Sequence, residues 1–165
     1  CADEVELLVN GASAGRVVPE RFRAVFNVKY APGTLEAVSY RNGHELSRDR
    51  LETAGAPAKL ALIPERVDAP ADGHSLVYVN MEVQDAQGRR VPTAEDVISV
   101  EIEGCATLAG FGGAAPMTEE NYSLNIGKAF EGRAQAVLRM ATTPGNAIIK
   151  ATYGALNGET EIKGE

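Results

Sequence analysis

The sequence contains no tryptophan, and aromatic residues make up only 5% of its 165 positions. Aromatic rings supply the flat apolar faces on which other rings stack, so a stacking platform for sugar rings is disfavoured. Basic residues are also outnumbered, because 16 Lys and Arg against 23 Asp and Glu give a net charge of −7. Binding to nucleic acid or to an anionic membrane requires clustered Lys and Arg, so we predict neither partner.

Long hydrophobic runs are missing as well. The longest apolar stretches, residues 59–63 and 76–79, are far shorter than the roughly 20 residues that a membrane-spanning helix needs. No signal peptide is visible and the first residue is Cys1 rather than Met, so we expect an excised piece of a longer polypeptide.

Cysteine and histidine are too few to build a metal site. The two cysteines, Cys1 and Cys105, are compatible with a disulfide or with a free, buried Cys105, which we favour because Cys105 lies in an apolar stretch. His44 and His74 each follow a glycine beside a turn and have no partner at metal-ligand spacing. We therefore predict no metal and no cofactor.

Period-two alternation of apolar and polar residues runs through the first part of the chain and predicts β-strands. The dipeptides Asn10-Gly11 and Asn42-Gly43 favour type I′ hairpin turns, and Ala31-Pro32-Gly33 favours a tight turn. We expect about five strands before residue 53. The clearest of them are residues 5–9, 22–28 and 35–40.

The small residues and proline of segment 53–57 interrupt this pattern and divide the chain into residues 1–54 and 55–165. The second part has about seven short strands separated by Gly, Pro and Asn turns, which is typical of an immunoglobulin-like sandwich. The clearest are residues 60–63, 77–83, 98–102, 134–140 and 148–153. We therefore predict an all-β chain of two immunoglobulin-like β-sandwich modules in tandem, the first truncated at its N-terminal side.

Several acidic pairs invite a catalytic interpretation, because glycosidases use two carboxylates about 5–10 Å apart. They are Asp3-Glu4, Glu95-Asp96 and Glu119-Glu120. Adjacent acids in loops are usually solvated, and Glu101 and Glu103 fall on the outward face of a strand. We predict no catalytic residue among them.

Three further kinds of catalytic or ion-binding motif are incomplete or missing in the sequence. No serine lies in a nucleophile elbow, and the glycine-rich segment 110–113 is not followed by a helix that could bind phosphate. The spacing of Asp68, Asp72 and Asp85 matches no calcium-binding loop.

Residues 110–122 form the longest predicted loop. Long loops in compact domains tend to be functional, so the segment either docks to a partner or packs over its own sandwich. The candidate docking residues are Phe111, Pro116, Glu119, Glu120, Asn121 and Tyr122.

Short segments spread over nearly the whole chain resemble the C-terminal modules of family-two glycoside hydrolases of the β-galactosidase type. In the first module they are residues 5–16, 28–40 and 51–58. In the second they are residues 71–73, 83–88, 91–92, 110–112, Pro116 and 130–134. One departure is that the family often has Gly-x-Gly-Asn-Gly-x-Pro where this chain has Gly-Phe-Gly-Gly-Ala-Ala-Pro at residues 110–116, without the Asn.

The resemblance implies a non-catalytic C-terminal accessory region of a bacterial glycosidase, an enzyme that acts on O-glycosidic bonds. The compartment of the parent protein stays open, with the periplasm or secretion favoured over the cytoplasm. In such enzymes the catalytic glutamates lie in a (β/α)₈ barrel, which this chain lacks. The implied partner is the catalytic domain of the same polypeptide, which the modules would pack on or space. We also expect self-association through the first module. The alternative is a carbohydrate-binding or cell-surface adhesion module.

Overall fold

The computed structural model describes residues 2–113 and 115–165. Every regular element in them is a β-strand, and no helix there could cross a membrane. The chain divides into two compact units, Cys1–Thr53 and Ala54–Glu165.

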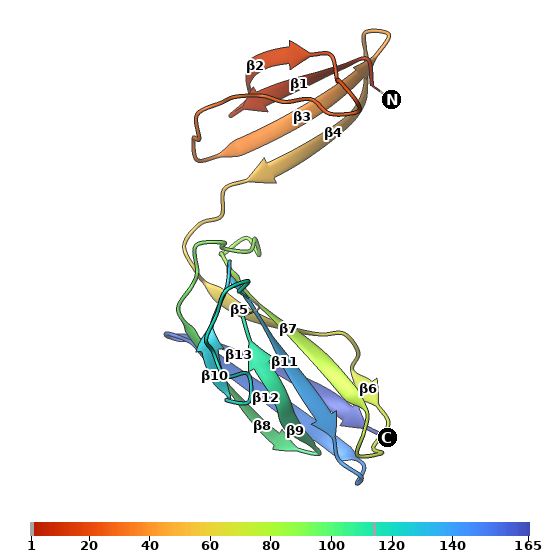
Figure 1. Cartoon of the computed structure of the whole chain (residues 1–165), viewed down its shortest axis with the longest axis vertical. Coiled ribbons are helices and arrows are strands. Elements are labelled where there is room, and N and C mark those ends of the chain that lie inside the picture. Colours follow the sequence, from red (N-terminus) through yellow and green to blue (C-terminus); the bar gives the residue numbers. More distant parts are fainter. Residues whose placement is uncertain (1, 114) are drawn as a thin grey trace. The chain divides into compact units, whose positions relative to one another are not determined.

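The first unit is one antiparallel sheet in the order β2-β1-β3-β4 (Figure 1). Its strands are β1 (Glu4–Val9), β2 (Ala12–Val17), β3 (Thr34–Arg41) and β4 (His44–Glu52). The two predicted hairpin turns are confirmed. Asn10 and Gly11 have φ of 51° and 79°, and Asn42 and Gly43 have φ of 51° and 77°, as type I′ turns require.

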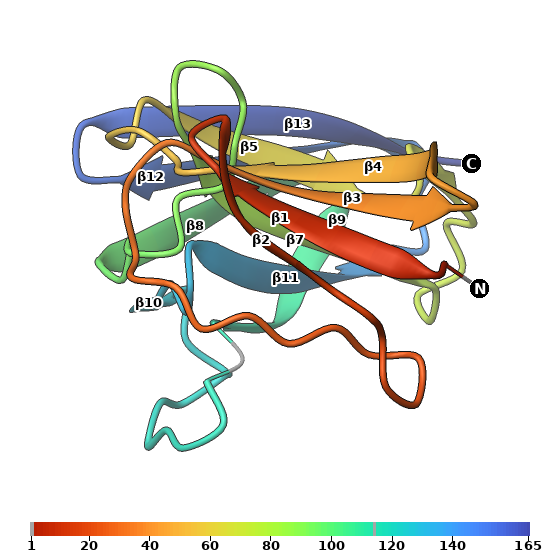
Figure 2. The ribbon, with the colours of Figure 1, turned by 90° about the horizontal axis from the view of Figure 1, so that it is seen from above.

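The strand predicted at residues 22–28 is wrong. This segment belongs to a long connection between β2 and β3 that contains no strand (Figure 2). The only pairing there is an isolated bridge between Glu20 and Arg23. Alternating side chains need a neighbouring strand before they form a ladder, and none lies beside this segment, so the unit has four strands rather than about five.

The second unit is a sandwich of two sheets, in the orders β5-β7-β11-β9 and β10-β8-β12-β13-β6 (Figure 1). Its strands are β5 (Lys59–Pro64), β6 (Asp68–Ala69), β7 (Leu76–Gln84), β8 (Val97–Gly104), β9 (Ala106–Gly112), β10 (Ile126–Lys128), β11 (Arg133–Met140), β12 (Gly145–Tyr153) and β13 (Leu156–Gly164). All pairs are antiparallel except β13 with β6.

The core of the second unit lies between the facing sheets. Alternate residues of β7, β8, β11 and β12 point inward and are buried, as their period-two patterns predict. The most deeply buried include Val77, Met81, Ile98, Leu138 and Ile149. The predicted all-β sandwich fold is confirmed.

Two long strands, β9 and β13, escaped prediction because glycine and small or polar residues dilute their patterns. Gly158 in β13 shows the reason. A Cβ there would lie 2.4 Å from Leu62 Cδ1 and 2.5 Å from the Leu60 carbonyl oxygen, so only glycine lets β13 approach β5.

Candidate functional site

One face of the first sheet carries a charged ladder that begins on β1, β2 and β3. Glu6 lies opposite Arg16 in the β1–β2 pair, and Arg16 Nη2 donates to Glu6 Oε2 at 3.0 Å. The Tyr40 hydroxyl donates to the same oxygen at 2.9 Å. The Arg16 guanidinium also lies 4.0 Å from the centre of the Tyr40 ring, a cation–π contact.

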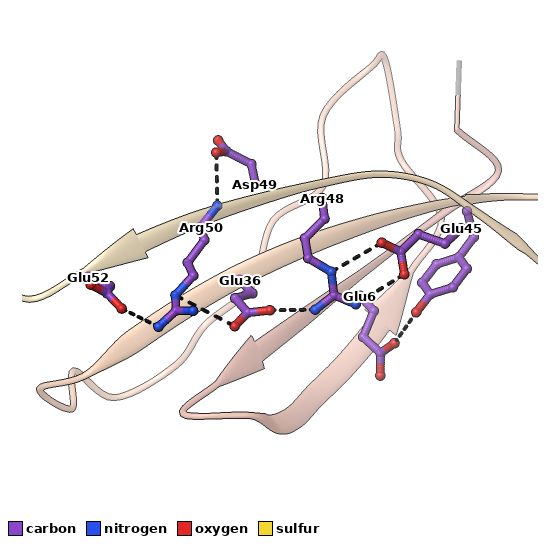
Figure 3. Close-up of polar contacts among 8 residues, drawn as sticks. Glu6, Glu36, Glu45, Arg48, Asp49, Arg50 and Glu52 are labelled. Atoms are coloured by element: carbon purple, nitrogen blue, oxygen red, sulfur yellow. Dashed lines mark hydrogen bonds and ion pairs between the residues drawn. The ribbon is translucent and has the colours of Figure 1, made fainter.

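The ladder continues on β3 and β4 (Figure 3). Arg48 pairs with Glu36 at 2.5 Å and with Glu45 at 3.1 Å. Arg50 lies 3.9 Å from Glu36 and pairs with Glu52. Exposed pairs of this kind contribute little stability individually.

The pKa values of Glu6 and Glu45 in the ladder shift in the direction opposite to the one that the catalytic acid of a glycosidase needs. Hydrogen bonds from Ser13 and Tyr40 lower the pKa of Glu6, and the hydrogen bond from Arg48 lowers the pKa of Glu45. A general acid needs a raised pKa so that it carries a proton at neutral pH. Neither carboxylate is suited to that role.

The opposite face of the sheet is apolar and borders a hollow. Val5 and Leu7 alternate with Glu6 along β1, so they point away from the ladder. Leu7 is buried, whereas Val5 borders a hollow of about 410 Å³ between β1 and the β2–β3 connection. The hollow is lined by Ala2, Val5, Pro19, Arg21, Phe22 and Ala24.

A tight turn beside this hollow exposes the aromatic side chain of Phe22 to solvent. Glu20 and Arg23 exchange two backbone hydrogen bonds of 3.0 Å, and the residues between them, Arg21 and Phe22, have φ of 51° and 66°. The left-handed region costs a residue other than glycine roughly 1–2 kcal/mol. Phe22 is nevertheless 89% exposed, so the described unit gains no burial in return. Backbone strain that no local packing offsets is typical of binding sites.

More of the β2–β3 connection is apolar and exposed. We call Phe22 and its exposed apolar neighbours Val25, Val28 and Tyr30 the apolar connection. The alternation of residues 22–28 predicted a strand here, which the structure does not form. The signal that could have located this site is the unusual density of apolar residues in a segment without a paired strand.

The residues of the predicted docking loop lie in different environments and do not form one surface. Phe111 belongs to β9 and is buried in the core, because its position in the strand directs it between the sheets, so its assignment to a docking surface is wrong. Glu120 accepts a hydrogen bond of 2.7 Å from the Lys128 N–H, and Asn121 accepts one of 2.9 Å from the Ser123 N–H.

The rest of this loop extends from the second unit between β9 and β10 (Figure 2). The Tyr122 ring occupies the space beside Gly112, where a Cβ would lie 2.4 Å from the ring. Pro116 and Glu119 are exposed. A docking role for the exposed part of the loop stays a prediction.

The other candidates are separate from one another. His44, His74, Glu95 and Asp96 are exposed, and residues 2–113 and 115–165 contain no group of three His, Cys, Asp or Glu placed to hold a metal. Cys105 is half-buried, and its pairing with Cys1 lies outside the described residues.

The described residues thus combine an all-β sandwich with a second sheet that carries arginine-paired carboxylates on one face and borders an apolar hollow on the other. Residues 60–161, more than half of the chain, match the sequence model of the glycoside hydrolase family 2 C-terminal domain 5. Residues 1–47 match a domain of unknown function, DUF4982. The chain therefore belongs to glycoside hydrolase family 2, as a C-terminal region of it, and the resemblance seen in the sequence is confirmed.

Known proteins agree with this assignment. The chain is 34% identical over 157 residues to the β-galactosidase BoGH2A of Bacteroides ovatus, covering 94% of this chain and 18% of that protein. It is 30% identical to a putative β-glucuronidase of Formosa agariphila, covering 90% of this chain and 15% of that one. A crystal structure of a family 2 member from Bacteroides cellulosilyticus matches 99% of this chain and 22% of its own, with a TM-score of 0.95 and 35% identity.

The chain spans only a small part of its relatives, between 13% and 23% of the length of the curated proteins it matches.

Proposed function

We propose that this chain is the accessory C-terminal region of a β-galactosidase-type glycosidase, and that it docks on the catalytic part of its polypeptide through the first unit. The observation that supports it is the similarity to a β-galactosidase along 94% of this chain but only 18% of that enzyme. The catalytic residues of such an enzyme would then lie in the part of the polypeptide outside these 165 residues. The role of this region is to hold or space that catalytic part.

The docking surface is the hollow together with the apolar connection. Phe22 is 89% exposed and Tyr30 is 81% exposed, and full burial of a large apolar side chain contributes about 1.5–3 kcal/mol. The opposite face, with its arginine–carboxylate pairs, is already satisfied in water. The occupant we propose for the hollow is a segment of the same polypeptide outside these 165 residues.

Activity measurements test the first part of the proposal. The polypeptide that includes the upstream region should release nitrophenol from nitrophenyl β-galactoside. The 165-residue chain should not, because its ladder carboxylates are paired with arginine and the pKa values of Glu6 and Glu45 are lowered. Turnover by the pure chain above that of a mock preparation would contradict the proposal.

Hydrogen exchange tests the docking surface. Residues 19–30 should exchange more slowly in the longer polypeptide than in the 165-residue chain, because docking buries them. Phe22→Ser should speed their exchange in the longer polypeptide and leave the short chain unchanged. The matched control is Val67→Ser in the second unit, where the side chain is 62% exposed but lies outside the hollow.

Three outcomes would overturn the docking proposal. Equal exchange of residues 19–30 in both proteins would show that nothing covers the hollow. Protection that rises with the concentration of the short chain would make a second copy the occupant. Protection on adding a galactose-containing oligosaccharide would favour the carbohydrate-binding alternative.

A further inference from the structure

The chain contains three Asn-Gly dipeptides, Asn10-Gly11, Asn42-Gly43 and Asn157-Gly158. Asparagine before glycine is prone to deamidation, because glycine has no Cβ to hinder its peptide nitrogen from approaching the side-chain carbon of the asparagine. All three asparagines are exposed. Sequence and exposure therefore do not distinguish them, and any difference in their reactivity must come from how the structure holds each side chain.

Two of the dipeptides have the same backbone conformation. Asn10 and Asn42 each begin a two-residue type I′ turn with φ of 51°, and the glycines that follow have φ of 79° and 77°. The peptide nitrogen that would attack is thus presented in the same way in both turns. The comparison between the two turns depends on the asparagine side chains alone.

The side-chain amide of Asn10 is held at both of its polar atoms. Its Nδ2 donates to the Pro32 carbonyl at 3.1 Å, and its Oδ1 accepts from the Thr34 N–H at 2.7 Å. The amide lies directly over Gly33, where a Cβ would come within 1.9 Å of Oδ1. Both hydrogen bonds must break before the amide carbon can rotate toward the Gly11 nitrogen.

Asn42 is anchored only through its backbone. Its N–H donates to Asp3 Oδ2 at 2.8 Å, which holds the turn in place. Its side-chain amide makes no hydrogen bond to residues 2–113 or 115–165. The amide carbon of Asn42 can therefore reach the Gly43 nitrogen by rotation of the side chain and local adjustment of the turn.

The third dipeptide lies inside a strand. In the β12–β13 pair, Asn157 is opposite Thr152 and Gly158 is opposite Ala151. Gly158 also packs closely against β5, since a Cβ there would lie 2.4 Å from Leu62 Cδ1. In an extended strand the side chain stands away from the next peptide nitrogen, so these two residues would have to leave the ladder before they could react.

We propose that Asn42 is a site of spontaneous deamidation. The Gly43 peptide nitrogen loses its proton and forms a bond to Asn42 Cγ, the Cγ–Nδ2 bond breaks, and Nδ2 leaves as ammonia with that proton. Solvent water then opens the resulting cyclic imide at either carbonyl and yields aspartate or isoaspartate. This site goes beyond the proposed function, because it concerns a covalent change in the chain and not its docking.

Each product should disturb the hairpin of β3 and β4. Aspartate places a negative charge on a turn whose N–H already binds the Asp3 carboxylate. Isoaspartate adds one carbon to the main chain between Arg41 and His44, the residues that close the β3–β4 pair. A type I′ turn has room for two residues of ordinary length, so isoaspartate should open this end of the hairpin.

Peptide mapping by mass spectrometry tests the site on the 165-residue chain incubated at mildly alkaline pH. Trypsin separates the three dipeptides, and each converted amide gains mass as it becomes a carboxyl group. Asn42 should react about 10- to 100-fold faster than Asn10, the ratio expected when two ordinary hydrogen bonds restrain the slower amide. Asn157 should react more slowly than Asn42 as well. In urea the three sites should react at similar rates, because only the sequence then acts.

Gly33→Ala tests why Asn10 is protected. The added Cβ displaces the Asn10 amide from its two partners, so Asn10 should react at a rate close to that of Asn42. Asn42 in the same variant is the matched control, and an unchanged rate there shows that the first sheet is intact. If this variant unfolds, the rates of Asn10 and Asn42 in the unsubstituted chain still decide the proposal.

Three results would overturn the proposal. Equal rates at Asn42 and Asn10 in the folded chain would show that the hydrogen bonds of Asn10 do not matter. An Asn42 that reacts in urea but not in the folded chain would show that the turn itself prevents the attack. An Asn10 that stays slow in Gly33→Ala while Asn42 is unchanged would show that the side-chain contacts are not the cause of its protection.

Discussion

The two units of this chain are built from the same kinds of strand but bury very different amounts of apolar surface. In the second unit, two facing sheets enclose a continuous cluster from Leu60 to Ile162. In the first, Leu7 and Val38 are the buried hydrophobic residues among those described, while Phe22, Tyr30 and Leu51 are exposed. Hydrophobic burial is the main favourable contribution to folding. The second unit therefore has a core of its own, whereas the first buries few apolar side chains among the described residues.

The largest effect expected is at the centre of the second core. Leu138 is fully buried in β11, so Leu138→Ala should lower the free energy of unfolding of this unit by about 2–5 kcal/mol through lost contacts and a cavity. Glu101→Ala, on the outward face of β8, should change it by no more than about 0.5 kcal/mol. Urea unfolding monitored by residues of each unit measures both. Equal losses at the two positions would show that the faces are wrongly assigned.

The corresponding change in the first unit should cost less. Leu7 is 8% exposed, and it lies in the first unit, where few other described hydrophobic side chains are buried. We expect Leu7→Ala to cost about 2 kcal/mol, the lower end of the range for such truncations. The same substitution in the longer polypeptide should cost more, if docking completes the core. A loss in the short chain equal to that of Leu138→Ala would remove the contrast between the units.

The units should also unfold at different temperatures. Few described hydrophobic residues are buried in the first unit, so we expect it to melt first and the second to melt separately. Calorimetry of the chain and of Leu138→Ala distinguishes the transitions, because only the upper one should shift. A single transition that moves as a whole would show that the units fold cooperatively.

The effect of Phe22→Gly on stability should have opposite signs in the 165-residue chain and in the longer polypeptide. Phe22→Gly removes a side chain that is 89% exposed and relieves a φ of 66°. We expect the first unit of the 165-residue chain to become more stable by about 0.5–1 kcal/mol, after the entropy that glycine adds to the unfolded chain. In the longer polypeptide the same change should lower the stability of the first unit if Phe22 is buried on docking, as we propose. Stabilisation in both proteins would show that Phe22 contacts nothing.

The smallest effect expected is a loss of stability of the second unit at acid pH. Backbone hydrogen bonds from Ser75 and His74 lower the pKa of Asp72 from an ordinary 3.8 to about 2. A carboxyl whose pKa falls on folding stabilises the native state above its unfolded value, and this contribution disappears as the pH falls through the folded value. The second unit should therefore be more stable than its Asp72→Asn variant at pH 6, and the difference should shrink between about pH 4 and 2. A difference that does not change over this range would contradict the assignment.

The sequence predicted the elements whose signals are local. The Asn-Gly dipeptides located two turns, and the alternation in β7 and β11 located the centre of the second core, because a strand buried on one face repeats every two residues. Residues 22–28 alternate in the same way, but whether an alternating segment becomes a strand depends on a neighbour that can lie anywhere in the chain.

Other features of the structure depend on non-local contacts. Phe22 is exposed because a turn of two residues without glycine holds it there, which no propensity favours. Asp85 is buried because its carboxylate finds four donors, and one of them comes from a segment 30 positions away. The resemblance to family 2 located the chain among known proteins, but it did not distinguish these residues from their neighbours.

The charged ladder extends to an open edge of the first sheet, where pairing with another molecule could begin. Strand β4 lies at an edge of the first sheet and is exposed along its whole length, so its outer backbone groups could pair with a strand of another molecule. Arg48 and Arg50 lie on this edge strand with their ion-pair partners, and charged side chains on an edge strand disfavour its pairing with another chain. We therefore expect the charged ladder to disfavour intermolecular sheet growth at the open edge that β4 forms.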